Sequence, residues 1–171
     1  MDLYTFLIIG HVIGTVLGVG GATFSEIFYL KALKDGKMDP VESGFLKTTY
    51  TVLRIGMIFV VLSGFGMLLW LNFVGNESAL FEPKIWAKMT VTIVILINAL
   101  LLQTRSIPIW LASSLSFTSW YTALILGLWR GISYSYIEIM LGYIVAVLVV
   151  AWILEKIKKL YFARGKNQKS K

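Results

Sequence analysis

The stretch LYTFLIIGHVIGTVLGVGGATFSEIFY, residues 3–29, decides the fold of this chain. It has 27 residues and only one acidic side chain, Glu26, which stands near its end. A helix that crosses the hydrocarbon core of a bilayer needs about 20 mainly apolar residues, and a soluble core helix is usually shorter. We therefore predict a transmembrane helix over residues 3–29.

The composition of the whole chain leads to the same class of protein. Of its 171 residues, 57% are hydrophobic and 15% are charged. Soluble domains average about 45–50% apolar and about 25% charged residues. This excess of apolar residues excludes a disordered protein, a disulfide-stapled domain and a nucleic-acid-binding domain. We therefore interpret the net charge of +7 as a sign of membrane topology.

Four more apolar segments are long enough to span, which predicts an all-α bundle of about five transmembrane helices. The segment 107–128 is rich in hydroxyl side chains, so we expect it to pack inside the bundle with these groups bonded to backbone carbonyls. We predict one domain over residues 1–162 and a basic, disordered cytoplasmic tail over 163–171. The start Met1-Asp2 lacks the positive region of a signal peptide, so the first helix should be retained. The four further predicted spans are 51–74, 85–102, 107–128 and 137–154.

The basic residues predict the orientation. With five spans, thirteen of the sixteen Lys and Arg residues fall on the side of the C-terminus. Cytoplasmic loops are enriched in Lys and Arg, so we expect the N-terminus outside and the C-terminus in the cytoplasm. The predicted location is the cell (inner) membrane, as a multi-pass protein. On the outer side this leaves Lys84, Lys88 and Arg130.

The first span carries the only histidine, His11, on one face with Gly14 and Gly18. Small residues at four-residue spacing let another surface approach the helix backbone. That surface can be a neighbouring helix or a flat ligand, and packing between helices is the commoner use. The second span offers a matching small-residue surface, formed by Gly56, Ser63, Gly64 and Gly66.

Ionisable residues at membrane depth are costly, and they are commonly functional. Lys84 and Lys88 lie one helical turn apart at the outer start of the third span, and His11 lies about 12 Å below the outer end of the first. At the inner boundary, Glu26 and Arg54 have similar depths. We predict that these two form a structural ion pair.

One histidine and no cysteine restrict the metal chemistry that the chain can support. An imidazole beside small residues, with two cations above it, suits a b-type haem: His11 would ligate the iron, and Lys84 and Lys88 would meet the propionates. Gly14 and Gly18 would leave room for the macrocycle. The sixth position stays open between Met, water, no ligand, and His11 of a second copy in a homodimer.

Three blocks of the chain resemble the HemJ-type protoporphyrinogen oxidases and the wider CopD-like membrane group. These blocks are FLIIGHVIGTVLGVGGATFSEIFYLKAL at 6–33, RIGMIFVVLSGFGMLLW at 54–70 and PKIWAKMTVTIVILIN at 83–98. The resemblance covers about residues 3–98. It implies that His11 and the basic pair Lys84 and Lys88 are functional, with His11 and Lys88 catalytic. It also implies a membrane oxidoreductase that passes electrons from a porphyrin substrate to quinone.

The chain departs from that family in two ways. The first basic residue of the pair is usually Arg there, and Lys84 cannot form the bidentate fork that Arg makes with a carboxylate. The family commonly has four helices, whereas five are predicted here.

Two other function classes remain open from the sequence. One is CopD-like transport of copper or a small solute, with Met and His11 as Cu(I) ligands because cysteine is absent. The other is a non-catalytic membrane assembly subunit, in which the glycine face of the first helix docks a partner.

Overall fold

The computed structural model describes residues 2–35, 39–104, 106–129, 131 and 133–168, without the side chains of 33–35, 77 and 162–168. Within these residues the protein is all-helical. Five helices are long and apolar enough to cross a membrane, as predicted, so the chain is a multi-pass membrane protein by length and composition. In order, the helices are α1 (Leu3–Asp35), α2 (Pro40–Phe73), the short α3 (Glu77–Leu80), α4 (Pro83–Gln103), α5 (Ile109–Leu128) and α6 (Tyr136–Gln168).

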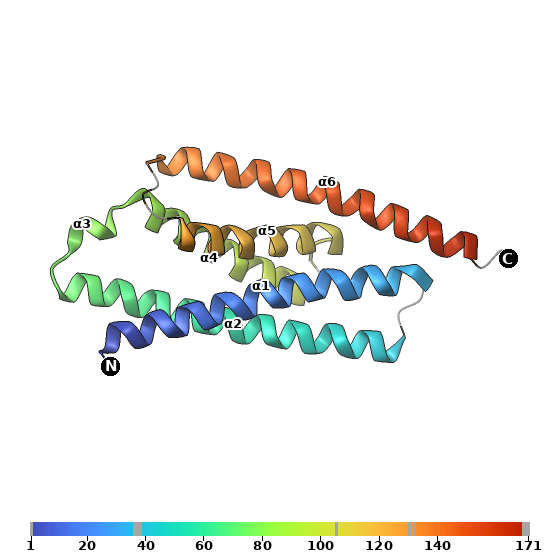
Figure 1. The fold of residues 1–171 in the computed structure, drawn as a ribbon, viewed down its shortest axis with the longest axis horizontal. Helices are drawn as coiled ribbons and strands as arrows, with labels where there is room; N and C mark the ends of the chain where they lie inside the picture. The colour runs from blue at the N-terminus through green and yellow to red at the C-terminus, as the bar shows by residue number, and fades with distance from the viewer. Residues whose placement is uncertain (1, 36–38, 105, 130, 132, 169–171) are drawn as a thin grey trace.

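The long helices run up and down, and the two termini lie at opposite ends of the bundle (Figure 1). Helices α1 and α2 form a closely packed antiparallel pair, while α5 packs against α1, α4 and α6. Helix α2 has few contacts with α4. The bundle is therefore tight around α1 and α5 and looser between α2 and α4.

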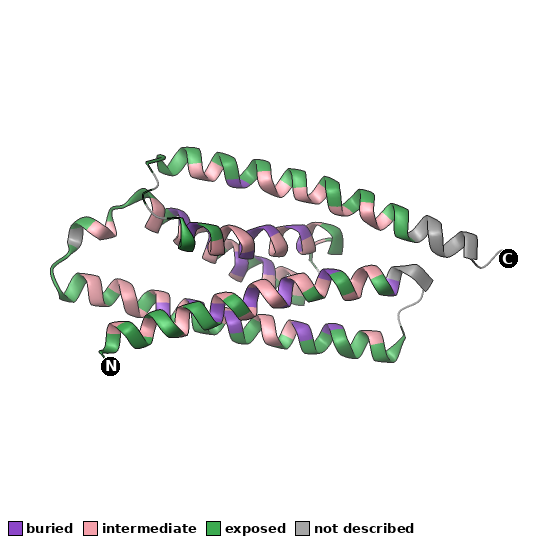
Figure 2. Ribbon diagram, in the orientation of Figure 1, coloured by how far each residue is buried: buried purple, intermediate pink, exposed green. Residues whose placement is uncertain are grey.

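Most outward-facing positions carry large apolar side chains, and Figure 2 shows how little of the ribbon surface is buried. Leu62, Phe65 and Leu148 are each more than 60% exposed. Such a surface would be a liability in water but matches a hydrocarbon solvent, where the helices satisfy their own backbone groups.

The core centres on Trp120 of α5, which is 2% exposed. It lies in a cluster with buried residues of α1, α2, α4 and α6. The hydroxyl-rich helix α5 is thus the central helix, as its composition predicted. Thr118 and Ser119 are buried and donate to the backbone carbonyls one turn earlier, at 2.8 and 2.6 Å.

Helix α2 begins eleven residues earlier than the predicted start of the second span, at residue 51. Asp39 caps it: its side chain accepts from the backbone N–H of Glu42 at 2.7 Å, and the Glu42 carboxylate accepts from the N–H of Asp39 at 3.1 Å. This reciprocal capping box, followed by Pro40 in the first turn, fixes a helix start well before the apolar run begins. Most of the connection that the predicted spans leave between residues 29 and 51 is therefore helical.

The last helix is also longer than predicted. Helix α6 continues to Gln168, whereas the sequence predicted a disordered tail from residue 163. Residues 169–171 lie outside the described part of the chain. Except for Gly165, the residues 163–168 have no strong helix breaker, so the helix can extend past the apolar span.

Candidate functional site

His11 lies on the face of α1 that meets α2, and its ring is partly buried. Its Nδ1 is 3.0 Å from the hydroxyl oxygen of Ser63. The Ser63 hydroxyl also lies 2.5 Å from the carbonyl oxygen of Phe59, to which it can only donate. A hydroxyl has one proton, so the Ser63 oxygen is left to accept from the Nδ1–H of His11. This network assigns the proton to Nδ1 and the lone pair to Nε2.

The residues of α2 that face the His11 ring have small side chains or none. A Cβ added to Gly64 would lie 3.5 Å from Cε1 of His11, which is ordinary contact. The small-residue surface predicted on the second span is therefore real, and it receives both His11 and the α1 backbone. The sequence could not show which residue of this surface forms a hydrogen bond with the imidazole of His11.

The glycines of α1 serve helix packing. A Cβ on Gly14 would lie 2.8 Å from the carbonyl oxygen of Gly56, and one on Gly18 would lie 2.1 Å from the ring of Trp120. Neither distance is tolerable, so α2 and Trp120 occupy the space beside these glycines. The predicted room for a macrocycle at Gly14 and Gly18 is absent from this structure. The same packing covers the face that an assembly subunit would use for docking.

The two cations of α4 have different surroundings. Lys84 donates to the backbone carbonyl of Trp129, which ties the start of α4 to the end of α5. Lys88 is partly buried, and it lies close enough to His11 for its ammonium charge to act on the imidazole. The structure thus brings His11 and Lys88 into one neighbourhood and gives Lys84 a structural contact.

The predicted ion pair between Glu26 and Arg54 was wrong. Glu26 is 5% exposed, and its Oε2 lies 3.4 Å from Nζ of Lys158 on α6. Lys158 also donates to the hydroxyl of Ser113 at 2.9 Å, and it lies 4.8 Å from the ring centre of Tyr29. Equal depth in the membrane did not decide the pairing, because the Arg54 side chain is exposed.

The sequence contains a signal for an inward-facing Lys158, beyond its contribution to the charge bias. Its position continues the inward stripe of α6 through Tyr143, Val147, Ala151 and Leu154, at helical spacing. A lysine on an apolar, inward-facing stripe needs a buried partner. The count of basic residues alone does not distinguish Lys158 from the other cations on the cytoplasmic side.

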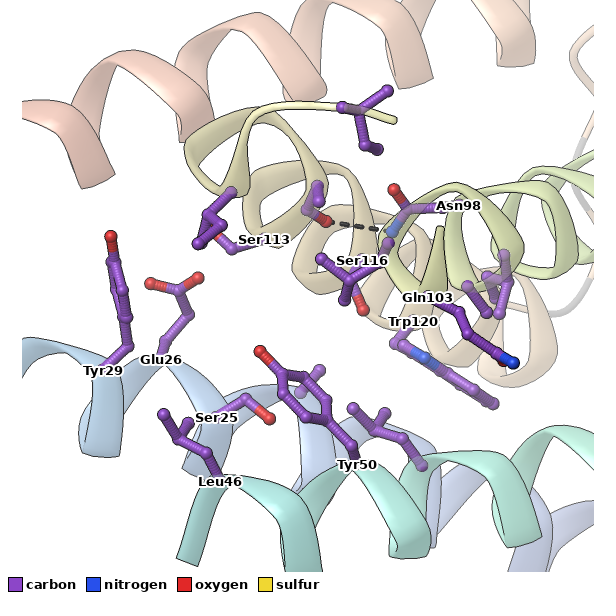
Figure 3. Close-up of a pocket in the computed structure, with 18 of the residues that line it drawn as sticks. Ser25, Glu26, Tyr29, Leu46, Tyr50, Asn98, Gln103, Ser113, Ser116 and Trp120 are labelled. Carbon is purple, nitrogen blue, oxygen red and sulfur yellow. Dashed lines mark hydrogen bonds between the residues drawn. The ribbon is translucent and has the colours of Figure 1, made fainter. Parts of the chain in front are cut away.

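Glu26 borders a cavity of about 620 Å³ between α1, α2, α4 and α5, which Figure 3 shows. It lies at the end of the bundle opposite His11, because Glu26 follows His11 by 15 residues, or about 22 Å of helix. Asn98 lines this cavity and donates from Nδ2 to the carbonyl of Ala112 at 2.9 Å. The protein therefore has two separate polar regions at membrane depth.

Comparison with known proteins identifies no relative of this chain. No family model, no curated protein and no solved structure matches it.

Proposed function

We propose that this protein is an integral membrane protein that binds haem b through Nε2 of His11. The observation that carries the proposal is the hydrogen-bond arrangement at His11, where Ser63 holds the proton on Nδ1 and leaves Nε2 as the donor atom for a metal. A ligating histidine typically donates its other N–H to an oxygen acceptor, which fixes the ring and raises its basicity. Ser63 would have this role.

Lys88 supports the proposal through charge. It lies near His11, is partly buried and forms no ion pair with another described residue, and a buried cation without such a partner is costly. A propionate of haem, or a carboxylate of a porphyrin substrate, would supply that partner. Gly14 and Gly18 have no part in the site as now proposed, because the chain itself fills the space beside them.

Haem would supply one-electron redox chemistry at this position. We propose, from the resemblance at residues 3–98, that the reaction is oxidation of a porphyrinogen with quinone as the acceptor. For each pair of hydrogens removed, two electrons and two protons would leave the porphyrinogen, and the quinone would take up both to become a quinol. His11 and Lys88 are the residues that we expect to carry this activity.

We further propose that the protein lies in the cell membrane with its N-terminus outside and its C-terminus in the cytoplasm. The wide difference in Lys and Arg between the two ends of the bundle supports this orientation. Trp86 and Trp129 are about half exposed near the end that we place outside, as expected for interfacial anchors.

The haem content of the purified protein tests the haem proposal. Protein purified in detergent from haem-replete cells should show a Soret band and close to one haem per chain, and His11→Ala should lose most of it. A colourless wild-type protein that is folded by circular dichroism would refute the proposal.

The oxidoreductase proposal has its own assay. Under anaerobic conditions the purified protein should reduce a soluble quinone when a porphyrinogen is added. Lys88→Met should lower the rate by about tenfold or more, because a charge-assisted hydrogen bond is typically worth about 1.5–3 kcal/mol. A haem-loaded protein without turnover would be consistent with the haem site but would refute the oxidoreductase proposal.

A further inference from the structure

The cavity of about 620 Å³ at the Glu26 end of the bundle has the size of a small-molecule site. Its polar side chains come from α1, α2, α4 and α5 and point into one space (Figure 3). Ser25 and Glu26 come from α1, and Asn98 comes from α4. The haem proposal uses none of these residues, so the cavity is a separate feature of the molecule.

Three buried polar atoms that border this cavity have no hydrogen-bond partner among the described residues. They are Oδ1 of Asn98, Oγ of Ser25 and Oε2 of Glu26. Asn98 is 3% exposed and Glu26 is 5% exposed. Most buried polar atoms in proteins are paired, and an unpaired one costs about 1–3 kcal/mol. Glu26 has an ion-pair partner in Lys158 at 3.4 Å, so the oxygens of Asn98 and Ser25 are the ones that indicate a partner outside the described residues.

The chemistry of these atoms restricts what that partner can be. The Asn98 amide donates from Nδ2 to Ala112, so its free end is the carbonyl oxygen, which can only accept. Oε2 of Glu26 lies at ion-pair distance from Lys158 but outside hydrogen-bond geometry, so it too can accept. A molecule that pairs with either oxygen must bring a hydrogen-bond donor.

The rest of the cavity wall is apolar and aromatic. Leu53, Met57 and Ile95 line it, and the buried Trp120 contributes one side. These surfaces favour an apolar or aromatic body over a hydrated ion or a sugar. The occupant should therefore be amphipathic, with a small donor group on an apolar frame.

The boundary between α2 and α4 offers a route into the cavity that suits an amphipathic molecule. Helices α2 and α4 both contribute to the wall, yet they have few contacts with each other. Arg54 of α2 and Gln103 of α4 are exposed at this end and also border the cavity. A lipid-soluble molecule can reach the space from the bilayer between these two helices.

We propose that this cavity binds a small lipid-soluble hydroxyl compound of the phenol class. Its O–H donates to Oδ1 of Asn98, and its ring and alkyl substituent pack against Trp120 and the apolar wall. This site lies in the opposite half of the bundle from His11, so it stands or falls independently of haem binding.

A matched pair of probes tests the donor requirement: 4-hexylphenol, and 4-hexylanisole, which has the same body without the O–H. We expect 4-hexylphenol to raise the thermal unfolding midpoint of the purified protein in detergent by several degrees, at a concentration at least tenfold below that needed for the ether. Equal effects of the two probes, or no effect of either, would overturn the proposal.

Variants test the location. Asn98→Leu removes the acceptor, and Ala99→Phe fills the cavity while keeping Asn98. Each should abolish the preference for the phenol, whereas Ser78→Ala in the distant connection should keep it. Because Asn98→Leu also loses the bond to Ala112, Ala99→Phe provides an answer if the former does not fold. A phenol preference that persists in a folded Ala99→Phe protein would place the binding elsewhere and refute the proposal.

Discussion

Single residues decide the chemistry of this protein, and the clearest case is Ser63. Its hydroxyl bonds the carbonyl of Phe59 and the ring of His11 at once. The sequence marked Ser63 as part of a small-residue surface, but its partner could not be predicted because that depends on how α1 and α2 are rotated against each other. His11 itself was identifiable as the only histidine of the chain.

Ser63→Ala removes the acceptor for Nδ1–H and should weaken haem retention by about tenfold, as losses of outer-shell partners typically do. Thr51→Val is the matched control, since Thr51 makes the same kind of bond to the carbonyl one turn earlier on the exposed part of α2. Titration of haem into the haem-free proteins measures both. Equal affinity in Ser63→Ala and wild type would show that Ser63 does not orient the ring.

The buried pair of Glu26 and Lys158 should matter for stability. Glu26→Gln leaves a buried ammonium without its carboxylate, and breaking such a pair usually costs about 3–5 kcal/mol. Lys158→Met in the same chain should recover much of the loss, because a neutral pair needs no counter-charge.

Equilibrium unfolding in detergent measures this effect. The control is Glu155→Gln, which breaks the exposed pair with Lys159 and should change the free energy of unfolding by less than about 1 kcal/mol. Additive losses in the Glu26→Gln, Lys158→Met double variant would contradict a coupled pair.

At the scale of the helices, the spans were predictable and their ends were not. Apolar length identified all five long helices, and hydroxyl content identified α5 as the inner one. The start of α2 depends on the capping box at Asp39, which a hydropathy pattern does not reveal. Equal depth suggested Arg54 for Glu26, whereas the partner came from α6, because depth says nothing about which way a side chain points.

Glycine positions on α1 test its packing. Gly18→Ala would push a methyl into the ring of Trp120, and such overpacking typically costs about 1–3 kcal/mol. Gly20 has open space around its Cα, so Gly20→Ala should be neutral or stabilising by up to about 1 kcal/mol.

Thermal unfolding of the two variants in one detergent compares them. Trp120→Leu should partly rescue Gly18→Ala by making room for the methyl. Equal unfolding midpoints for Gly18→Ala and Gly20→Ala would contradict the close contact between Gly18 and Trp120.

The whole molecule has a tight α1–α2 pair and a looser boundary between α2 and α4. Neither the cavity nor its unpaired oxygens could be predicted, since a cavity arises where several helices fail to fill space. Glu26 and Arg54 border it, and the sequence predicted them only as an ion pair with each other. The orientation, in contrast, can be proposed from sequence alone, because it depends on the count of basic residues at each end.

The absence of native cysteine makes the orientation easy to measure. Ser78→Cys, in the connection after α2, should react with a membrane-impermeant maleimide on intact cells. Ser43→Cys, at the start of α2, should react only after the membrane is opened. The reverse labelling pattern would invert the proposed topology.

Rescue of the His11 position tests the central claim most directly. His11→Ala should lack the Soret band, and adding imidazole together with haem should restore it, because free imidazole can occupy the space of the missing ring and bind iron. Restoration in His11→Ala is the result that we predict. A His11→Ala protein that keeps the wild-type Soret band without imidazole would show that iron has another ligand and would contradict the account.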